Sequence, residues 1–301
     1  MLHRLLVPLD GSPSAEAVLP LAAFLAQRAG ARVMLLHLVE HHAPATVHGQ
    51  RHLTSAAEAE NYLADVARRC FPSTVNVVWH VHDREIDDVA HGLADHAGEL
   101  DCDLVVMLSH GQWDFRRWLS GSLAQQTVRR RAPSPILLLR AGADGTIPAS
   151  FRQLLLLLDG RPEHESGVPA AIDLARLCGA PLRLLMVVPT LTTLRGEDAA
   201  AGQLLPAATR EVLDLAEHEG MEYLQRQLLR MRAEGVDATA VIARGEPAAV
   251  ISEIAHDLKA DLLVLGTHGS AGIEAFWTGS LGQRLIAKLP VSFLLAPAGN
   301  P

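Results

Sequence analysis

One segment of the chain combines glycines, hydroxyls and a histidine at a spacing that suits phosphate binding. It reads Gly266-Thr267-His268-Gly269, continues for nine residues and closes with Gly279-Ser280. Glycines let backbone N–H groups approach phosphate oxygens, and a helix opening at the last pair adds the positive end of its dipole and a hydroxyl donor. A tight loop without a ligand is the alternative. No Lys follows Gly279, so this is not a Walker loop.

An aspartate ends an apolar run in each half of the chain. Asp10-Gly11 follows residues 3–9, and Asp159-Gly160 follows residues 152–158. Parallel sheets bind ligands at the carboxyl ends of their strands, where an Asp can accept hydrogen bonds from an adenine amino group or a ribose hydroxyl. A turn or a helix N-cap is the competing interpretation. The glycine-rich segment, predicted at the same edge, favours the ligand.

These residues are positioned by an internal duplication. The stretch from Arg4 to Gly11 aligns with the stretch from Gln153 to Gly160 at an offset of 149 residues. The stretch from Asp103 to Gly111 aligns with Asp261 to Gly269 at an offset of 158. The second copy has therefore gained about nine residues, which we place around residues 195–206.

Each copy alternates apolar runs with helical patterns. We predict strands at 3–9, 32–39, 75–82, 104–108 and 136–140, and at 152–158, 182–188, 237–243, 262–265 and 292–296. Helices are expected at 13–29, 54–70 and 85–98, and at 163–178, 207–234 and 247–258, with a fourth in each copy after the glycine loop. The pattern predicts two doubly wound α/β domains with parallel sheets, spanning residues 1–142 and 150–301.

The two copies differ in their loops. The first reads Leu108-Ser109-His110-Gly111, continues for nine residues and closes with Gly121-Ser122. Leu108 replaces the first glycine and narrows the approach to a ligand, whereas Asp10 is retained. We expect weaker binding in this copy, or a vacant or different pocket.

Composition restricts the function classes. The net charge of −8 disfavours nucleic acid as a partner. The three cysteines show no paired spacing, and the apolar runs are too short for a signal core or a membrane span, so a cytoplasmic location is expected.

Histidines concentrate in the first copy, which holds eleven of the fifteen up to residue 110. His80 and His82 are spaced to point the same way on a strand, and five others lie on or after the second strand: His37, His41, His42, His48 and His52. No metal-ligand motif supports a metal site here, so a polar loop together with two surface or core histidines is the favoured interpretation, and a metal-binding sensor is the alternative.

Over nearly its whole length the chain resembles a tandem universal stress protein. The loop of the second copy and the Asp after the first strand carry this resemblance. It implies two five-stranded parallel sheets in strand order 3-2-1-4-5, paired through their fifth strands as a pseudo-dimer within one chain, and it leaves a homodimer of the chain open.

The resemblance also implies an ATP site, with Mg as an accompanying ion. Adenine would lie near Asp159, Gly160 and Val187, and a loop after the third strand would contribute Gly245. The phosphates would lie over the glycine loop: Gly266, Thr267, His268, Gly269, Gly279, Ser280 and Leu281. The corresponding weaker set in the first copy is Asp10, Leu38, Ser109, His110, Gly111, Gly121 and Ser122.

Binding is favoured over catalysis, and no catalytic residue is predicted. Neither an acidic cluster dedicated to Mg²⁺ nor a cationic residue beside the loop is evident, as phosphoryl transfer requires. The expected role is nucleotide binding in a stress response or its regulation. A slow ATP hydrolase is the enzymatic alternative.

Overall fold

The computed structural model describes residues 1–41, 44–47, 49–109, 126–127, 133–141, 146–194, 196–267 and 281–297. The chain divides into two compact units. The first comprises Met1–Ser150 and Pro290–Pro301, and the second comprises Phe151–Leu289. The predicted domains, 1–142 and 150–301, differ from these units mainly at the C-terminal segment, which groups with the first unit.

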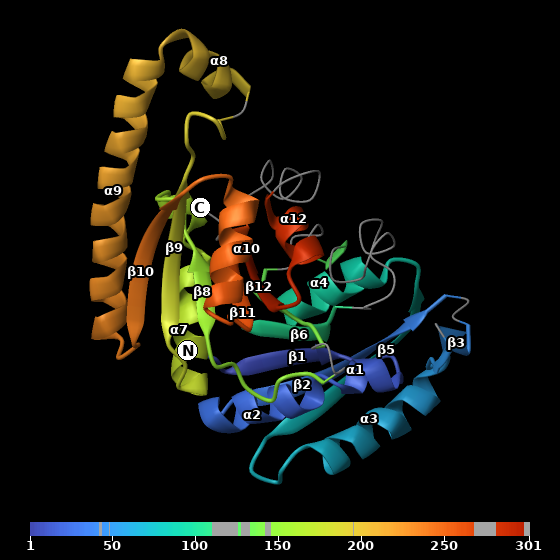
Figure 1. Ribbon diagram of the computed structural model, residues 1–301. Helices are drawn as coiled ribbons and strands as arrows, with labels where there is room; N and C mark the ends of the chain where they lie inside the picture. Colours follow the sequence, from blue (N-terminus) through green and yellow to red (C-terminus); the bar gives the residue numbers. More distant parts are fainter. Residues whose placement is uncertain are drawn as a thin grey trace. The chain divides into compact units, whose positions relative to one another are not determined.

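Six strands form the sheet of the first unit (Figure 1), in the order β12 (Ser292–Pro297), β7 (Ile136–Leu139), β6 (Leu104–Leu108), β1 (Arg4–Pro8), β2 (Arg32–Glu40) and β5 (Val77–Ile86). Strands β7, β6, β1, β2 and β5 are parallel and have the predicted order of one repeat. Strand β12 pairs antiparallel with β7.

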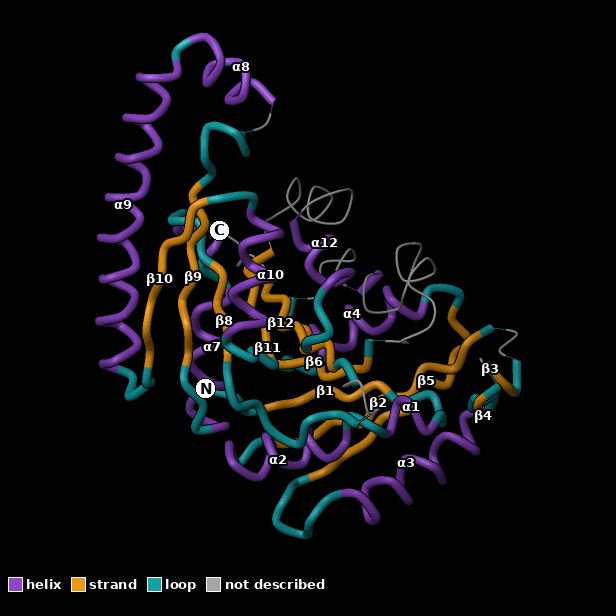
Figure 2. The backbone as a smooth tube through the Cα atoms, viewed as in Figure 1, coloured by secondary structure: helices purple, strands orange, loops and turns teal. Residues whose placement is uncertain are grey.

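Helices cover both faces of this sheet, as a doubly wound fold requires. In Figure 2, α2 (Leu19–Ala29) and α3 (Ala56–Cys70) lie on one face and α4 (Val89–Glu99) lies on the other. A short helix, α1 (Pro13–Glu16), and a hairpin of β3 (Thr46–Val47) and β4 (Gln50–Arg51) complete the described elements.

The second unit contains four parallel strands in the order β10 (Ala238–Arg244), β9 (Leu182–Val188), β8 (Leu154–Leu157) and β11 (Leu262–Thr267). Its described helices are η1 (Pro162–His164), α7 (Gly167–Cys178), α8 (Gly196–Leu204), α9 (Pro206–Ala233), α10 (Pro247–Asp257) and α12 (Leu281–Lys288). The fold class predicted from the sequence, a parallel sheet flanked by helices in each repeat, is confirmed.

The core is aliphatic because aromatic residues are scarce. The strands nearest the centre of each sheet are almost entirely Leu and Val, and Leu5, Leu6, Leu154 and Leu155 have no exposed surface. Strands buried on both faces read as continuous apolar runs, which is why the repeat pattern located them. Helices α2 and α7 end at Gly30 and Gly179, which adopt the left-handed conformation that suits glycine at a helix C-terminus.

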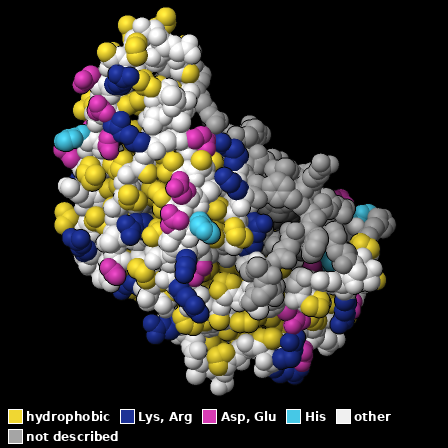
Figure 3. Space-filling model, in the orientation of Figure 1, with side chains coloured by type: hydrophobic (Ala, Val, Ile, Leu, Met, Phe, Trp, Pro, Cys, Tyr) yellow, Lys and Arg dark blue, Asp and Glu magenta, His cyan; other side chains and the backbone are white. Residues whose placement is uncertain are grey.

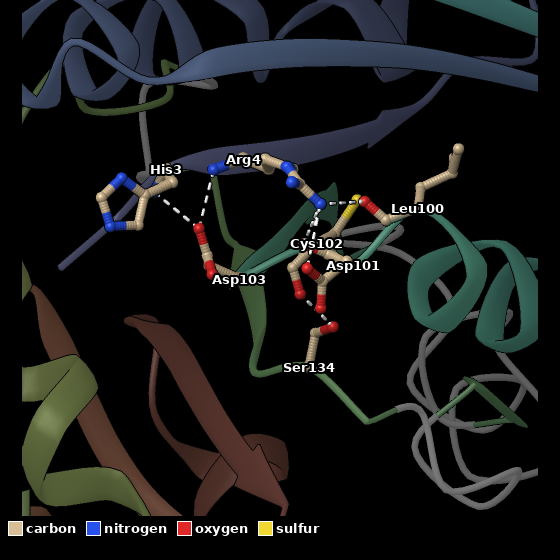
Figure 4. A network of polar contacts seen from close by, with 7 residues as sticks. All are labelled: His3, Arg4, Leu100, Asp101, Cys102, Asp103 and Ser134. Atoms are coloured by element: carbon tan, nitrogen blue, oxygen red, sulfur yellow. Dashed lines mark hydrogen bonds and ion pairs between the residues drawn. The ribbon is translucent and has the colours of Figure 1, made fainter.

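Both repeats anchor the beginning of their first strand in the same way. Asp103 accepts hydrogen bonds from the backbone N–H groups of His3 and Arg4 at 2.6 and 2.7 Å (Figure 4). Asp261 does the same for Arg152 and Gln153 at 2.8 and 3.0 Å. These aspartates precede β6 and β11, so each one ties its strand to the neighbouring first strand at the amino-terminal edge of the sheet.

Several elements differ from the prediction. The helix expected at 13–29 is broken into α1 and α2, with Pro20 in the first turn of α2. Strand β5 continues to Ile86, past an irregularity in its pairing with β2, so α4 begins at Val89 rather than near residue 85. The inserted residues of the second copy form α8.

Helix α9 is longer than its sheet contacts require. Its C-terminal half buries Tyr223, Leu224 and Met231, whereas Val212 and Leu215 remain exposed. Figure 3 shows hydrophobic side chains over α8 and α9. In the part of the chain that the structure describes, no helix has the length and apolarity needed to cross a membrane.

Candidate functional site

Part of the predicted site lies outside the described residues. This holds for His268, Gly269, Gly279 and Ser280 of the second repeat and for His110, Gly111, Gly121 and Ser122 of the first. His42 and His48 lie outside them as well. The remaining predicted residues are placed as follows.

In the second unit, the predicted residues meet at the carboxyl-terminal edge of the sheet. Leu157 of β8 pairs with Leu265 of β11 on one side and with Leu185 of β9 on the other. Asp159, Gly266 and Val187 follow these three residues by one or two positions, so they lie at neighbouring strand ends. The chain leaves β8 toward β9 and α7, and β11 lies on the other side. This is therefore the topological switch point, where parallel α/β sheets bind ligands.

Three further predicted residues belong to elements that begin or end near this edge. Gly245 follows β10 directly and donates its N–H to the carbonyl of Val188 at 3.1 Å. Leu281 is the first residue of α12 and is half-buried. Thr267 is the last residue of β11. Among the described residues predicted for the second repeat, Asp159, Gly160, Val187, Gly266 and Thr267 therefore lie at neighbouring strand ends, and Gly245 lies at the end of the next strand.

Asp159 is held in a tight turn. Its Oδ1 accepts a hydrogen bond from the Arg161 N–H at 3.1 Å, and Gly160 adopts a φ of +84° that other residues rarely take. Asp10 forms the same turn, with its Oδ1 accepting from the Ser12 N–H at 2.9 Å. The turn that we weighed as the alternative is therefore present in both repeats. An ionised carboxylate has about four acceptor positions, so the turn leaves acceptor capacity for a ligand.

A histidine makes the second-repeat turn chemically different. The Oδ2 of Asp159 contacts Nδ1 of His164, a side chain that is only 11% exposed. At the offset of the duplication, the first repeat has Ala15 in this position. Sequence reasoning missed His164, although its place five residues after Asp159 in one copy alone was a visible signal.

Gly266 is constrained by its protein neighbours. A Cβ atom at this position would collide with the carbonyl oxygen of His164 and would lie 3.0 Å from Oγ of Ser166. The turn that carries His164 therefore crosses directly over the end of β11. The fold itself therefore requires a glycine at position 266, in addition to any role of Gly266 in the approach of a phosphate.

A cationic side chain belongs to the helix that follows the glycine-rich segment in the sequence. Arg284, in the first turn of α12, donates from Nη1 to Oε1 of Glu246 at 2.7 Å. Burial acts to raise the pKa of Glu246, but hydrogen bonds from the Ala249 N–H and from Arg284 outweigh it and hold that pKa below its usual value. The signal in the sequence was an Arg four residues after Ser280, where the first repeat has Gln126.

The first repeat contains a small pocket at the corresponding edge. Its volume is about 100 Å³, below the roughly 300 Å³ at which ligand pockets usually begin. Its walls include the predicted residues Asp10 and Leu38, together with Leu108, the residue that replaces the leading glycine. Ser109 follows β6 and donates its N–H to the Leu139 carbonyl at 2.8 Å. Leu108 therefore lines this pocket at the position where the second repeat has Gly266.

His37 is buried and lines this pocket, and the buried His52 lies near His37. Nδ1 of His37 donates a hydrogen bond to the carbonyl oxygen of Leu9 at 2.8 Å. His52 places Nε2 3.3 Å from Oε1 of Glu40. Burial is the main cause that lowers the pKa of His37, and the neighbouring His52 adds to it. These two histidines are buried polar residues, which the interpretation of the segment as a polar loop did not anticipate.

The family profile described as the universal stress protein family matches residues 1–140 and 150–297. The universal stress protein YxiE of Bacillus subtilis is 27% identical over 139 residues, which cover 45% of this chain and 91% of that relative. One such protein therefore corresponds to about half of the chain.

Solved structures agree with this result. A universal stress protein from Archaeoglobus fulgidus superposes with a TM-score of 0.64 at 14% identity, covering 99% of this chain and 97% of that one. At this low sequence identity, the structural similarity shows that the two proteins share a fold. Another universal stress protein from A. fulgidus, solved in complex with dAMP, covers 48% of this chain and 97% of its own, with a TM-score of 0.34 and 18% identity.

Proposed function

Because the chain belongs to the universal stress protein family, we propose that its second repeat binds an adenine nucleotide, with ATP as the ligand and Mg²⁺ as the accompanying ion. The observation that carries the proposal is the position of Asp159 and Gly266 at adjacent strand ends of the switch point. Asp159 and Gly160 would receive the adenosine moiety beside Val187. The segment from Gly266 to Leu281 would receive the phosphates, with His268, Gly269, Gly279 and Ser280 contributing as the motif predicts.

The proposed role is regulatory binding in a stress response rather than rapid turnover. Both carboxylates described at this edge have partners within the protein. Asp159 contacts His164 and Glu246 accepts from Arg284. Carboxylates engaged in this way are poorly suited to dedicated Mg²⁺ coordination, on which phosphoryl transfer depends.

The first repeat is proposed as the weaker site. Leu108 lines its small pocket, and Gln126 replaces the arginine of the second repeat. Both differences remove features that would help to accommodate a triphosphate. Asp10 and the rest of its loop are retained.

We also propose that the two repeats pair through their fifth strands. The antiparallel register of β12 with β7, in which Leu294 faces Leu137, supports this pairing. On this basis we propose that the repeats keep the limits predicted from the sequence, 1–142 and 150–301. We separately propose a cytoplasmic location, which the short apolar runs of the sequence led us to expect. Association of two whole chains is compatible with the same arrangement.

A matched pair of substitutions tests the nucleotide site. Gly279→Leu places a side chain where the phosphates would lie, and Gly121→Leu makes the same change in the first repeat. We expect Gly279→Leu to abolish ATP binding by the full-length chain and Gly121→Leu to leave it nearly unchanged. Intact ATP affinity in Gly279→Leu would show that the phosphate loop is assigned wrongly. Mass spectrometry of ligands that co-purify with the unmodified chain would identify the nucleotide directly.

A further inference from the structure

Three histidines converge in the first unit, away from the carboxyl-terminal strand ends. His80 and His82 belong to β5, and His96 belongs to α4. One ring nitrogen of each lies within 4.8 Å of those of the other two. Alternate residues of a strand share a face, so His80 and His82 both point toward the helix that carries His96.

The rings are arranged around a common point rather than stacked. The centroids of His82 and His96 lie 5.0 Å apart with perpendicular planes, and those of His80 and His96 lie 5.3 Å apart with planes tilted by 32°. Nitrogen atoms that bind one Zn²⁺ at about 2.0–2.1 Å in tetrahedral geometry lie about 3.3 Å apart. Modest side-chain rotation would therefore close the cluster around an ion.

His96 is already fixed in the form that a metal ligand needs. Its Nδ1 lies 2.8 Å from the carbonyl oxygen of Gly92, one helical turn earlier. A carbonyl only accepts hydrogen bonds, so Nδ1 must carry the proton, and Nε2 of the neutral ring has the lone pair. Metal-binding histidines usually donate their second nitrogen in this way, which fixes the tautomer and the ring orientation.

The surroundings favour the uncharged form of His80. Partial burial of the ring is the main cause that lowers the pKa of His80, and the proximity of His96 and His82 lowers this pKa further, while Asp83 and Glu60 act in the opposite direction. Neutral imidazole is the metal-binding form. The cluster is also accessible, because His80 is exposed, His82 is half-buried and only His96 is buried.

We propose that His80, His82 and His96 bind one divalent transition-metal ion in the first repeat. Three imidazole nitrogens suit Zn²⁺, Cu²⁺, Ni²⁺ and Co²⁺ and disfavour Mg²⁺ and Ca²⁺, which prefer oxygen ligands. Three protein ligands leave a fourth position for water or a further ligand. The ion would join α4 to β5. This site is separate from the proposed nucleotide site and does not depend on it.

The test is a calorimetric titration of the tag-free full-length chain with Zn²⁺ after removal of metal by a chelator. We expect one Zn²⁺ per chain, with His80→Ala and His82→Ala each weakening the affinity more than about 100-fold, the upper end of the loss seen when only a supporting residue is removed. His91→Ala is the matched control. His91 lies on α4, is exposed and pairs with Asp95 outside the cluster.

Two spectroscopic measurements complete the design. Circular dichroism establishes that the variants are folded, which the exposure of His80 favours. Substituted Co²⁺ gives visible absorption bands whose intensity reports four-coordinate binding, and we expect these bands in the wild-type chain and in His91→Ala alone. The proposal is overturned if the wild-type chain fails to bind Zn²⁺ at millimolar concentration. It is equally overturned if folded His80→Ala and His82→Ala bind as the wild type does, or if His91→Ala loses binding as they do.

Discussion

The guanidinium group of Arg284 donates to the carboxylate of Glu246 over 2.7 Å and so joins the first turn of α12 to the residue that caps α10. Both helices begin at the edge of the sheet where Asp159 and Gly266 lie. Arg284 also follows, by four residues in the sequence, the segment that the motif assigns to phosphate. This proximity gives the first of our predictions.

Replacing Arg284 should weaken the binding of nucleotides in proportion to their phosphate content. Hydrogen bonds to charged groups contribute about 1.5–3 kcal/mol, so Arg284→Ala should lower ATP affinity about tenfold or more while changing adenosine affinity little. Isothermal titration with both ligands measures the difference. Arg244→Ala is the control, because Arg244 pairs with Asp214 and Glu217 on the surface. Equal losses for adenosine and ATP would assign Arg284 a purely structural role.

His164 should act as a positioning residue for Asp159. Its contact with Oδ2 restricts the rotation of the carboxylate that we assign to the adenosine moiety. His164→Ala releases that restraint, and the loss of one net hydrogen bond, about 0.5–1.5 kcal/mol, corresponds to roughly a 2- to 12-fold lower affinity for adenosine and ATP alike. The exposed His218→Ala serves as the comparison. Tighter binding by His164→Ala would mean instead that this histidine competes with the ligand.

Gly266→Ala should destabilise the second unit even without a ligand. The added methyl group would meet the His164 carbonyl, a backbone atom that cannot move alone. Overpacking of this kind costs about 1–3 kcal/mol of unfolding free energy, which a urea titration measures as a lower midpoint. Gly98→Ala is the matched control, since a Cβ there meets only Pro133 at 3.4 Å. Unchanged stability in Gly266→Ala would contradict the crossing of η1 over β11.

The stability of the first unit should fall in acid partly because of His37. Its pKa in the folded state lies below 6.5, mainly through burial, so the unfolded chain takes up a proton first as the pH falls. The stabilisation is complete above pH 6.5 and is lost as the pH falls toward the folded-state pKa. Around His37 lie the Leu9 carbonyl, His52, Asp10 and Glu40.

Urea unfolding at about pH 7.5 and about pH 5 measures this loss. His37→Gln removes the titrating group, so the difference between the two pH values should shrink in this variant. The exposed His256→Gln should retain the full difference. A wild-type difference that persists in His37→Gln would assign the acid sensitivity to other groups.

The sequence predicted the buried apolar strands and the residues that directly follow those strands. Asp159 and Gly266 were predicted because both follow apolar strands, whose carboxyl ends meet at one edge of a parallel sheet, whereas Val187 came from the family resemblance. The order of strands within one repeat came from the family resemblance and is confirmed by the pairing of β1 with β2 and β6.

Residues whose contacts form only when a helix packs against another element could not be predicted from their positions after strands. His164 reaches Asp159 because η1 turns back over β11, and Arg284 reaches Glu246 because α12 begins beside α10. His96 meets His80 and His82 only after α4 has packed on the sheet, so the spacing of the strand residues revealed two members of the cluster and not the third. The extension of β5 to Ile86 depends on its pairing with β2, which local propensity does not encode.

The most direct test of the central claim is a calorimetric titration of the full-length chain with ATP, repeated with Asp159→Ala and Asp10→Ala. These variants remove the same side chain from the same turn in the two repeats. Binding in the second repeat predicts one high-affinity site that Asp159→Ala weakens strongly and Asp10→Ala preserves. Equal ATP affinity in Asp159→Ala and the wild-type chain, or loss of the site in Asp10→Ala alone, would contradict the assignment.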